Sequence, residues 1–439
     1  MDKRKTWRTA IELGKDILIV ALICSAAWML REAGLWQRVS LTDELTPGIT
    51  GQQISAEDRA DAARPMSITA TLQGGLHPER CVVRYDDAEV DGLFRQLAGL
   101  LVETLSSLDE PTEVARATWE AALAQSPGIC FDFQGEIPLS VLGGWLGVEQ
   151  ELPSVTARRL LLTVYGEDVA LYCYDISGQR WLRCTTEVVS AVQLENALEG
   201  MTADGAYYAF ESGVTENMAP DTVLSPTPAP MPVATAANAA AGGRSALEGL
   251  MEDLNINLSG CVFYSAAGEE VARIGSDTLR LSTSGVLEYH ADEGSGRQFS
   301  VAALSGESGV FGAVESCRNL LQQVTSDRCG QARLYLSRVE EREQGWDLEF
   351  EYRLNGVSVV LKQGCAAAFE IRNNHITSFT LRLRSYTLGG EEQLVLPPVQ
   401  ASAAMSALSL RGQELRLVYP DGGEERLVPG WAAMAETEG

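Results

Sequence analysis

Histidine and closely spaced cysteine, the side chains that most often hold zinc in proteins, are scarce in this sequence. None of its three histidines lies in an HExxH or HxxxH arrangement, so a zinc hydrolase has no ligand set. The nine cysteines form no CxxC pair, and a chain this long and apolar is not expected to depend on a disulfide scaffold. We therefore predict no metal and no cofactor. The histidines are His77, His290 and His375, and the cysteines stand at positions 24, 81, 130, 173, 184, 261, 317, 329 and 365.

Basic charge is also scarce beyond the first residues. Residues 1–16 carry five basic and three acidic side chains, a balance of +2; since the whole chain carries −26, the remainder carries −28. Such a body repels a phosphate backbone, and nucleic acid is excluded as a partner. The hydrophobic content of 45% and the charged content of 21% are ordinary for folded protein, so disorder is not expected as the dominant state.

Recognisable catalytic motifs are missing as well. The nearest approach to a GxSxG elbow is Gly306-Glu307-Ser308-Gly309, which lacks the final spacing. Residues 87–92 begin like a calcium loop, but the twelfth position is Ala98, so we interpret these acids as part of a helix start. His375 follows Asn373-Asn374, and we expect it to be an exposed turn residue. We therefore predict that the chain is not an enzyme.

A single long apolar run stands near the start of the chain, at Ile17–Leu30. It is shorter than the roughly 20 residues that cross a bilayer, but the stems of Lys15 and Arg31 can reach the headgroups and Trp7 and Trp36 suit the interfaces. We predict an uncleaved membrane anchor rather than a cleaved signal peptide, the alternative that a basic start and a short apolar core also fit.

The anchor sets the predicted topology. Residues 1–16 form a cytoplasmic tail, 17–36 the transmembrane anchor and 37–65 a juxtamembrane segment, with the bulk of the chain extracytoplasmic because the basic side precedes the span. Ala21 and Ser25 form a small-xxx-small pair that lets helix backbones approach closely, which makes them candidate partner-binding residues. The alternative is that both face lipid on an inert anchor.

Hydrophobic periodicity predicts an α+β class, in which the anchor is followed by two or three domains of antiparallel sheet with helices, the first of them at residues 66–215. Asp86 and Asp87 precede the helical run from Val90 to Leu101. Cys173 and Cys184 are the one cysteine pair that we expect to face each other across a hairpin, and whether they are bonded stays open. The predicted strands are 67–72, 129–133, 160–165, 169–174 and 180–185, with further helices at 111–125 and 137–146.

A Pro/Ala-rich segment, residues 216–244, is predicted to be an extended linker, because it has five prolines and almost no large apolar residue. It precedes a β-rich C-terminal block at 245–431 and a tail at 432–439. Asn355-Gly356 between alternating runs is a strong hairpin signal. The predicted strands of this block are 261–265, 270–274, 278–282, 286–290, 333–339, 346–354, 357–361, 367–372, 376–386 and a hairpin of 414–419 with 425–428; its helices are 311–324 and 398–408.

The order of these features, together with several stretches of sequence, resembles the YycH/YycI family. The first block carries PMSITATL, GLFRQLAGLLVETL and CFDFQGEIPLSVLGGWLG, which are similar to the N-terminal domain of YycH. The second carries DTLRLSTSGVLEYH, FEYRLNGVSVV, FEIRNNHITSFTLRLRSY, LPPVQASAAMSAL and LRLVYPDGGEERLVPGW, which resemble the later domains of YycH and YycI, the last of them PepSY-like. The resemblance covers most of residues 7–431 and departs from the family in the proline-rich segment and the many cysteines.

The resemblance implies a bacterial, membrane-anchored accessory protein that modulates the WalK/YycG sensor histidine kinase of cell-wall metabolism. Its implied partners are that kinase and a YycI-like sister protein in the membrane. Two other classes stay open: a tethered module that binds an envelope polymer or peptide, and a membrane-held hydrolase. Aromatic side chains gathered in a groove would favour the binding module, whereas a Ser-His-Asp cluster in a cleft would favour the hydrolase.

Overall fold

Antiparallel strand pairing organises the part of the chain that the computed structural model describes, which comprises residues 55–74, 78–212, 218–225, 230–292, 298–407 and 412–435. The α+β class is confirmed, with 26% helix and 44% strand. Residues Gly48–Gly439 form one compact unit. Within the described residues, no helix is long and apolar enough to cross a membrane. The predicted anchor, with Ala21 and Ser25, lies outside them.

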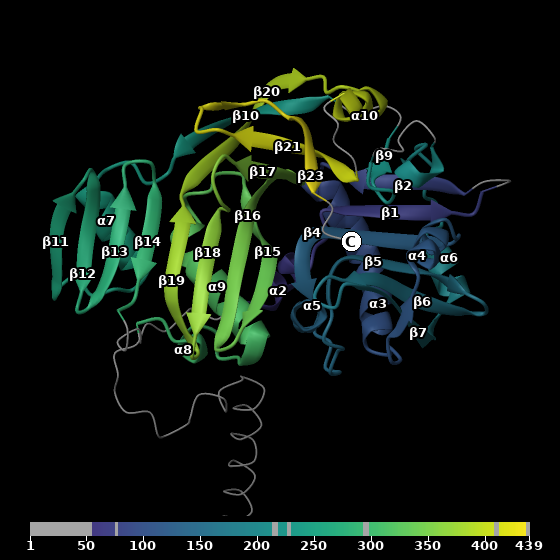
Figure 1. The fold of residues 1–439 in the computed structure, drawn as a ribbon, viewed down its shortest axis with the longest axis horizontal. Helices are drawn as coiled ribbons and strands as arrows, with labels where there is room; N and C mark the ends of the chain where they lie inside the picture. Colours follow the sequence, from purple (N-terminus) through teal and green to yellow (C-terminus); the bar gives the residue numbers. More distant parts are fainter. Residues whose placement is uncertain are drawn as a thin grey trace, which may run out of the picture. The chain divides into compact units, whose positions relative to one another are not determined.

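The first sheet has seven strands in the order β2-β1-β4-β5-β6-β7-β3 (Figure 1). The predicted meander of three antiparallel strands forms its centre. A separate pair, β8 with β9, lies between this sheet and the rest of the chain in the sequence. The strands are β1 Ser67–Leu72, β2 Glu79–Arg84, β3 Thr112–Val114, β4 Gly128–Pro138, β5 Thr156–Tyr165, β6 Asp168–Asp175, β7 Arg180–Ser190, β8 Tyr207–Tyr208 and β9 Val223–Leu224.

The long helix α3 begins where the sequence predicts. The Asp86 carboxylate accepts hydrogen bonds from the backbone N–H groups of Ala88 and Glu89, which have no partner within the helix. Val90, Phe94, Leu97 and Leu101 then recur at helical spacing and are buried. The helices of this part are α2 Ala56–Ala62, α3 Asp87–Leu105, α4 Arg116–Leu123, α5 Leu139–Leu146, α6 Ala191–Ala197 and the 3-10 turn η2 Ala209–Glu211.

The second sheet has eleven strands in the order β11-β12-β13-β14-β19-β18-β16-β17-β21-β23, with β15 paired to β16. All its pairs are antiparallel except β17 with β21. The strands are β11 Cys261–Ala266, β12 Glu269–Ile274, β13 Asp277–Ser282, β14 Val286–His290, β15 Arg333–Arg342, β16 Gly345–Leu354, β17 Val357–Leu361, β18 Ala367–Arg372, β19 His375–Arg382, β21 Gln413–Asp421 and β23 Gly430–Ala435; the helices are α7 Arg244–Asp253, α8 Val301–Ser305, α9 Gly309–Thr325 and α10 Pro398–Ala407.

Two turns of this sheet are confirmed. Asn355 and Gly356 have φ of 49° and 76°, and Asn373 and Asn374 have φ of 48° and 65°. Positive φ at both turn positions matches the right-handed twist of the flanking strands, which fixes the register of the β16–β17 and β18–β19 hairpins.

The predicted strand 376–386 is in fact two strands that belong to different sheets. β19 ends at Arg382, and β20 (Arg384–Gln393) begins after the single buried residue Leu383 in a three-stranded sheet of order β20-β10-β22. The break is held by Asp421, which accepts two hydrogen bonds of 2.9 Å from the Arg384 guanidinium and one of 2.8 Å from the Tyr386 hydroxyl.

The prediction of an extended linker at residues 216–244 is wrong for the described residues of both halves: Val223–Leu224 is strand β9, with Leu224 buried, and the second half contains another strand. Met231–Asn238 is strand β10, the middle strand of that three-stranded sheet. The sequence pattern concealed this strand because small residues form much of its buried surface: Ala234 and Ala236 are buried together with Met231 and Val233, and the strand pairs with β20 and β22. Helix α7 then begins at Arg244.

Two predictions made from local sequence are wrong because the residues pair with strands far away in the sequence. The helix predicted from residue 111 begins only at Arg116, since Thr112–Val114 pairs with β7. The predicted hairpin of residues 414–419 with 425–428 does not form: β22 (Arg426–Leu427) pairs with β10, and β21 pairs with β23.

The predicted blocks 66–215 and 245–431 share one apolar core, and their boundaries stay predictions. One cluster of buried side chains includes Phe94 and Trp145 from the first block and Cys317 and Leu348 from the second. The Trp145 indole N–H donates to the Glu315 carboxylate at 2.9 Å, which joins α5 to α9.

We expect Ala234→Asp to lower the free energy of unfolding by at least about 2 kcal/mol, because it buries a carboxylate without a partner. The matched control is Thr235→Asp at the neighbouring exposed position, which should change the free energy of unfolding by less than about 0.5 kcal/mol. Urea denaturation of both variants measures the difference. Equal effects would show that β10 is not a buried strand.

Candidate partner-binding cleft

Two adjacent arginines, Arg158 and Arg159, lie on β5 within the first sheet and are almost completely buried, with side-chain exposures of 3% and 5%. Successive strand residues normally point to opposite faces. Here the β4–β5 register shifts between Asp132 and Ile137, opposite Arg158. Both guanidinium groups therefore reach the Asp132 carboxylate, at 2.8 and 3.0 Å.

The same arginines bind Glu414 of β21, in the second sheet. Glu414 lies 2.6 Å from Arg158 and 2.8 Å from Arg159, and Arg416 on the same strand adds a contact of 2.7 Å. Arg159 also pairs with the buried Asp221. Together these six side chains join the first sheet to the C-terminal strands. They are Asp132, Arg158, Arg159, Asp221, Glu414 and Arg416, hereafter the arginine network.

Paired charge keeps the carboxylates of Glu414 and Asp132 ionised. Burial alone would raise the pKa of Glu414, but the guanidinium groups of Arg158, Arg416 and Arg159 outweigh it and hold that pKa well below its usual range. The pKa of Asp132 is lowered in the same way, against burial, by Arg158 and Arg159. Burial of an ion pair is tolerated only with such complete pairing.

Arg84 and Tyr85 lie where β2 ends. Arg84 donates to the Val223 carbonyl at 2.9 Å and to the Ser225 hydroxyl at 3.1 Å, and its guanidinium carbon lies 4.8 Å from the centre of the Tyr85 ring. Tyr85 has φ of 64°, an uncommon conformation that turns the chain at the end of the strand. Both side chains also line a narrow gap that contains Asp132, Arg159 and Glu414.

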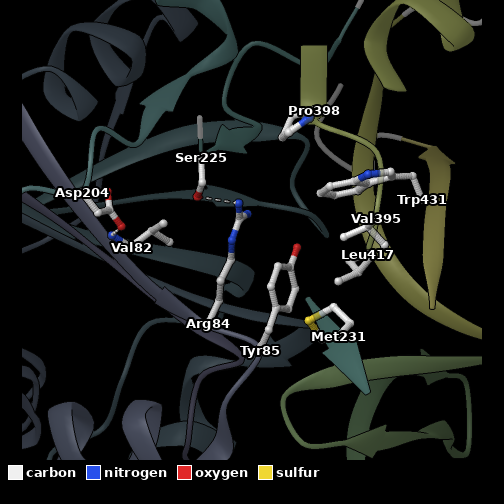
Figure 2. A pocket seen from close by; sticks show the side chains of 10 residues that line it. All are labelled: Val82, Arg84, Tyr85, Asp204, Ser225, Met231, Val395, Pro398, Leu417 and Trp431. Carbon is white, nitrogen blue, oxygen red and sulfur yellow. Dashed lines mark hydrogen bonds between the residues drawn. The ribbon is translucent and has the colours of Figure 1, made fainter. Parts of the chain in front are cut away.

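A cavity of about 180 Å³ opens beside this pair. Figure 2 shows Arg84 and Tyr85 side by side, with Trp431, Val395 and Leu417 on the facing wall and Met231 below. Strands β2, β10, β21 and β23, the start of α10 and the segment after β20 supply the walls. The lining residues are Val82, Arg84, Tyr85, Asp204, Ser225, Met231, Val395, Pro398, Leu417 and Trp431, hereafter the cleft.

Apolar side chains also stand exposed on the segment that forms one wall of the cleft. Leu394 is 75% exposed, Leu396 55% and Val399 44%. The Trp431 indole N–H donates to the Leu396 carbonyl at 2.7 Å, which fixes this segment against β23. Exposed apolar groups gathered beside a pocket are typical of protein-binding surfaces rather than of a monomer's ordinary surface.

The cleft suits an anchoring side chain of a protein or peptide. Its volume is below the roughly 300–1,000 Å³ of pockets for drug-sized ligands. Neither His290, exposed on β14, nor His375 lines it. Among the described residues, no group of His, Cys, Asp and Glu is placed to hold a metal ion.

The individual sequence predictions have mixed outcomes. His375 is half-buried rather than exposed, because its backbone bridges to Ser300; its Nδ1 lies 2.9 Å from the Asn373 carbonyl oxygen. His77 lies outside the described residues. The acids near the start of α3 do take part in its structure: Asp87 pairs with Arg353 at 3.3 Å, and Asp91 with Arg64.

Cys173 and Cys184 form no disulfide bond and do not lie directly opposite each other. The register places Cys173 opposite Leu182 and Cys184 opposite Leu171, so the two are diagonal neighbours on one face. Burial raises the pKa of Cys184 to about 11, which makes its thiol a poor nucleophile.

Sequence reasoning missed the arginine network and the cleft. One signal was present, because two adjacent arginines precede the apolar run Leu160–Tyr165, and charged residues at the start of a buried strand need partners. The partners themselves lie 26 to 27 residues before and 62 to 256 residues after them, beyond any local pattern.

Comparison with known proteins supports the fold. No protein-family model matches the chain, and no curated protein matches its sequence. Among solved structures, the chain is similar to the crystal structure of YycH from Bacillus subtilis, with a TM-score of 0.54 and 12% sequence identity. The match covers 89% of this chain and 97% of that chain. The chain therefore has a YycH-like fold, as the resemblance predicted.

We expect Arg159→Met to lower the free energy of unfolding by about 3–5 kcal/mol, since it leaves buried carboxylates with one cation fewer. The control is Arg426→Met, which removes an ion pair of the same kind between Arg426 and Glu391, whose side chains are 53% and 63% exposed. The Arg426→Met substitution should lower the free energy of unfolding by at most about 1 kcal/mol. Denaturant unfolding compares them, and a small effect at Arg159 would show that the network does not join the sheets.

Proposed function

We propose that this chain is a non-enzymatic, membrane-anchored extracytoplasmic regulator of a two-component sensor histidine kinase that controls cell-wall metabolism, the WalK/YycG type. The observation that carries the proposal is the YycH-like fold, which extends over nearly the full length of both chains. The proposed location is the bacterial cell membrane, with the N-terminus in the cytoplasm and the described body outside.

Regulation by such a protein requires contacts that differ between two states of the kinase, because a ligand shifts an equilibrium only by its differential affinity. The cleft and the exposed Leu394, Leu396 and Val399 are the outer surface that we assign to such a partner, either the kinase or a YycI-like sister protein. The C-terminal part, residues 245–431, is proposed to be the YycI- and PepSY-like portion.

A tethered module that binds an envelope polymer or a peptide is the second candidate. Tyr85 and Trp431 both line the cleft, and aromatic side chains in a groove favour a binding module. The two candidates differ in the effect of damaging the cleft. In the first, the output of the kinase changes; in the second, only the binding of the polymer or peptide changes.

Leu394→Asp combined with Val399→Asp should weaken partner contact and change the output of a kinase-controlled promoter several-fold, because charge is placed in an apolar interface. The control, Val188→Asp with Val192→Asp, adds the same charge at residues that are 55% and 61% exposed elsewhere. Circular dichroism checks folding, and in-cell cross-linking to the kinase checks contact. If both pairs leave the promoter output unchanged while the Leu394/Val399 pair alone weakens the binding of a peptide or wall polymer, the second candidate holds.

Replacing Ala21 and Ser25 together by Leu tests the span. The helix becomes more apolar and should stay inserted, but close backbone approach is blocked, at a cost of about 1 kcal/mol for each lost contact. The same promoter reporter should then change several-fold. A span of unrelated sequence and equal length is the control. Normal regulation by both variants would mean that the span is only an anchor.

A further inference from the structure

Strand β11, Cys261–Ala266, is the terminal strand of the eleven-stranded sheet (Figure 1). Within the described residues it pairs with β12 alone. Its residues Val262 and Tyr264 are 61% and 48% exposed. A strand in this position presents a row of backbone groups that another strand can bind.

The turn after β11 determines which backbone groups are presented. Ala267 and Gly268 form a two-residue connection with φ of 54° and 84°, and Ala266 lies opposite Glu269. In a hairpin of this kind the residues flanking the turn exchange both hydrogen bonds, and the pattern then alternates along the strand. The N–H and C=O groups of Phe263 and Ser265 therefore point away from β12.

Three other edge strands of the described part, β2, β20 and β3, are protected in ways that β11 is not. The edge of β2 is covered by Asp204, whose backbone N–H donates to the Arg80 carbonyl at 2.9 Å and whose carboxylate accepts from the Val82 N–H at 3.0 Å. β20 ends in the charged pair Glu391-Glu392, and β3 has only three residues. β11, with the sequence CVFYSA, has no charge, no proline and no register shift.

We infer that β11 binds β11 of a second copy of this chain, antiparallel across a twofold axis, so that the two sheets continue into each other. Each copy carries a net charge of −26, which opposes self-association, so a contact between two copies is favoured where the meeting strands add no like charges, and β11 itself carries none. A strand that meets its own copy must also be self-complementary.

The outward groups select the register. Phe263 of each copy exchanges hydrogen bonds with Ser265 of the other, and Tyr264 lies on the axis opposite its equivalent. Val262 then lies opposite Ala266 of the other copy. In this register the row that contains Arg273, which pairs with Val262, continues into the row of Glu269 in the second copy. Three strand spacings, about 14 Å, separate these charges, so their attraction is weak but of the correct sign.

Cysteine cross-linking of the purified full-length chain in detergent tests this register, in a background in which Cys261 of the same strand is replaced by Ser and with that background alone as the control for the other native cysteines. Tyr264→Cys should give a covalent dimer on mild oxidation, because the two Cβ atoms on the axis would lie about 4.5–5.5 Å apart. Val262→Cys, equally exposed on the same strand, should not, since its equivalent lies about four residues away, roughly 13 Å. Cross-linking of both variants alike, or of neither, would overturn the inference.

Two further variants test the association itself by light scattering of the same full-length sample. Tyr264→Lys places like charges face to face and should raise the dimer Kd at least about tenfold. Ser265→Pro removes an outward N–H without touching the β12 ladder and should have the same effect. A chain that is monomeric at all concentrations before substitution would refute the proposal.

Discussion

The convergence of Arg158 and Arg159 on Asp132 and Glu414 is the contact on which the rest of the arrangement depends. Asp132 and both arginines belong to the seven-stranded sheet, whereas Glu414 belongs to β21 of the eleven-stranded sheet. Buried charges of this kind are stable only when every partner is in place. The arginine network therefore fixes one relative position of the two sheets. The cleft that lies beside it consequently has a preformed shape.

The cleft follows from where strands end rather than from a motif. Arg84 and Tyr85 stand at the end of β2, Met231 at the start of β10 and Trp431 near the start of β23. None of these residues is close to another in the sequence, except the first pair. The walls that strands supply are held in place because each strand is paired within its sheet, and surfaces fixed in advance lose little entropy when they bind.

Sequence reasoning succeeded where the determining interactions are local. The start of α3 depends on Asp86 and the backbone N–H groups of Ala88 and Glu89. The Asn355-Gly356 turn depends on the φ preferences of those two residues. It failed where a partner far along the chain decides. Ala234 is buried in a cluster that includes Tyr386 and Tyr419, both far along the chain, and residues 426–427 pair with β10 rather than with β21. The arginine network has the same character, since the residues that neutralise Arg159 are distributed from Asp132 to Glu414. The predicted span with Ala21 and Ser25 lies beyond the described residues, so that part of the reasoning stays a prediction.

The passage of the chain from β19 to β20 through the single residue Leu383 has a mechanical consequence. With one buried residue between two strands of different sheets, and Arg384 clamped at once by Asp421, the junction has no slack. The three-stranded sheet is therefore tied through Leu383 to β19, whose neighbours are β14 and β18. A shift of one sheet against the other at this point would have to break the contacts of Asp421 with Arg384 and Tyr386.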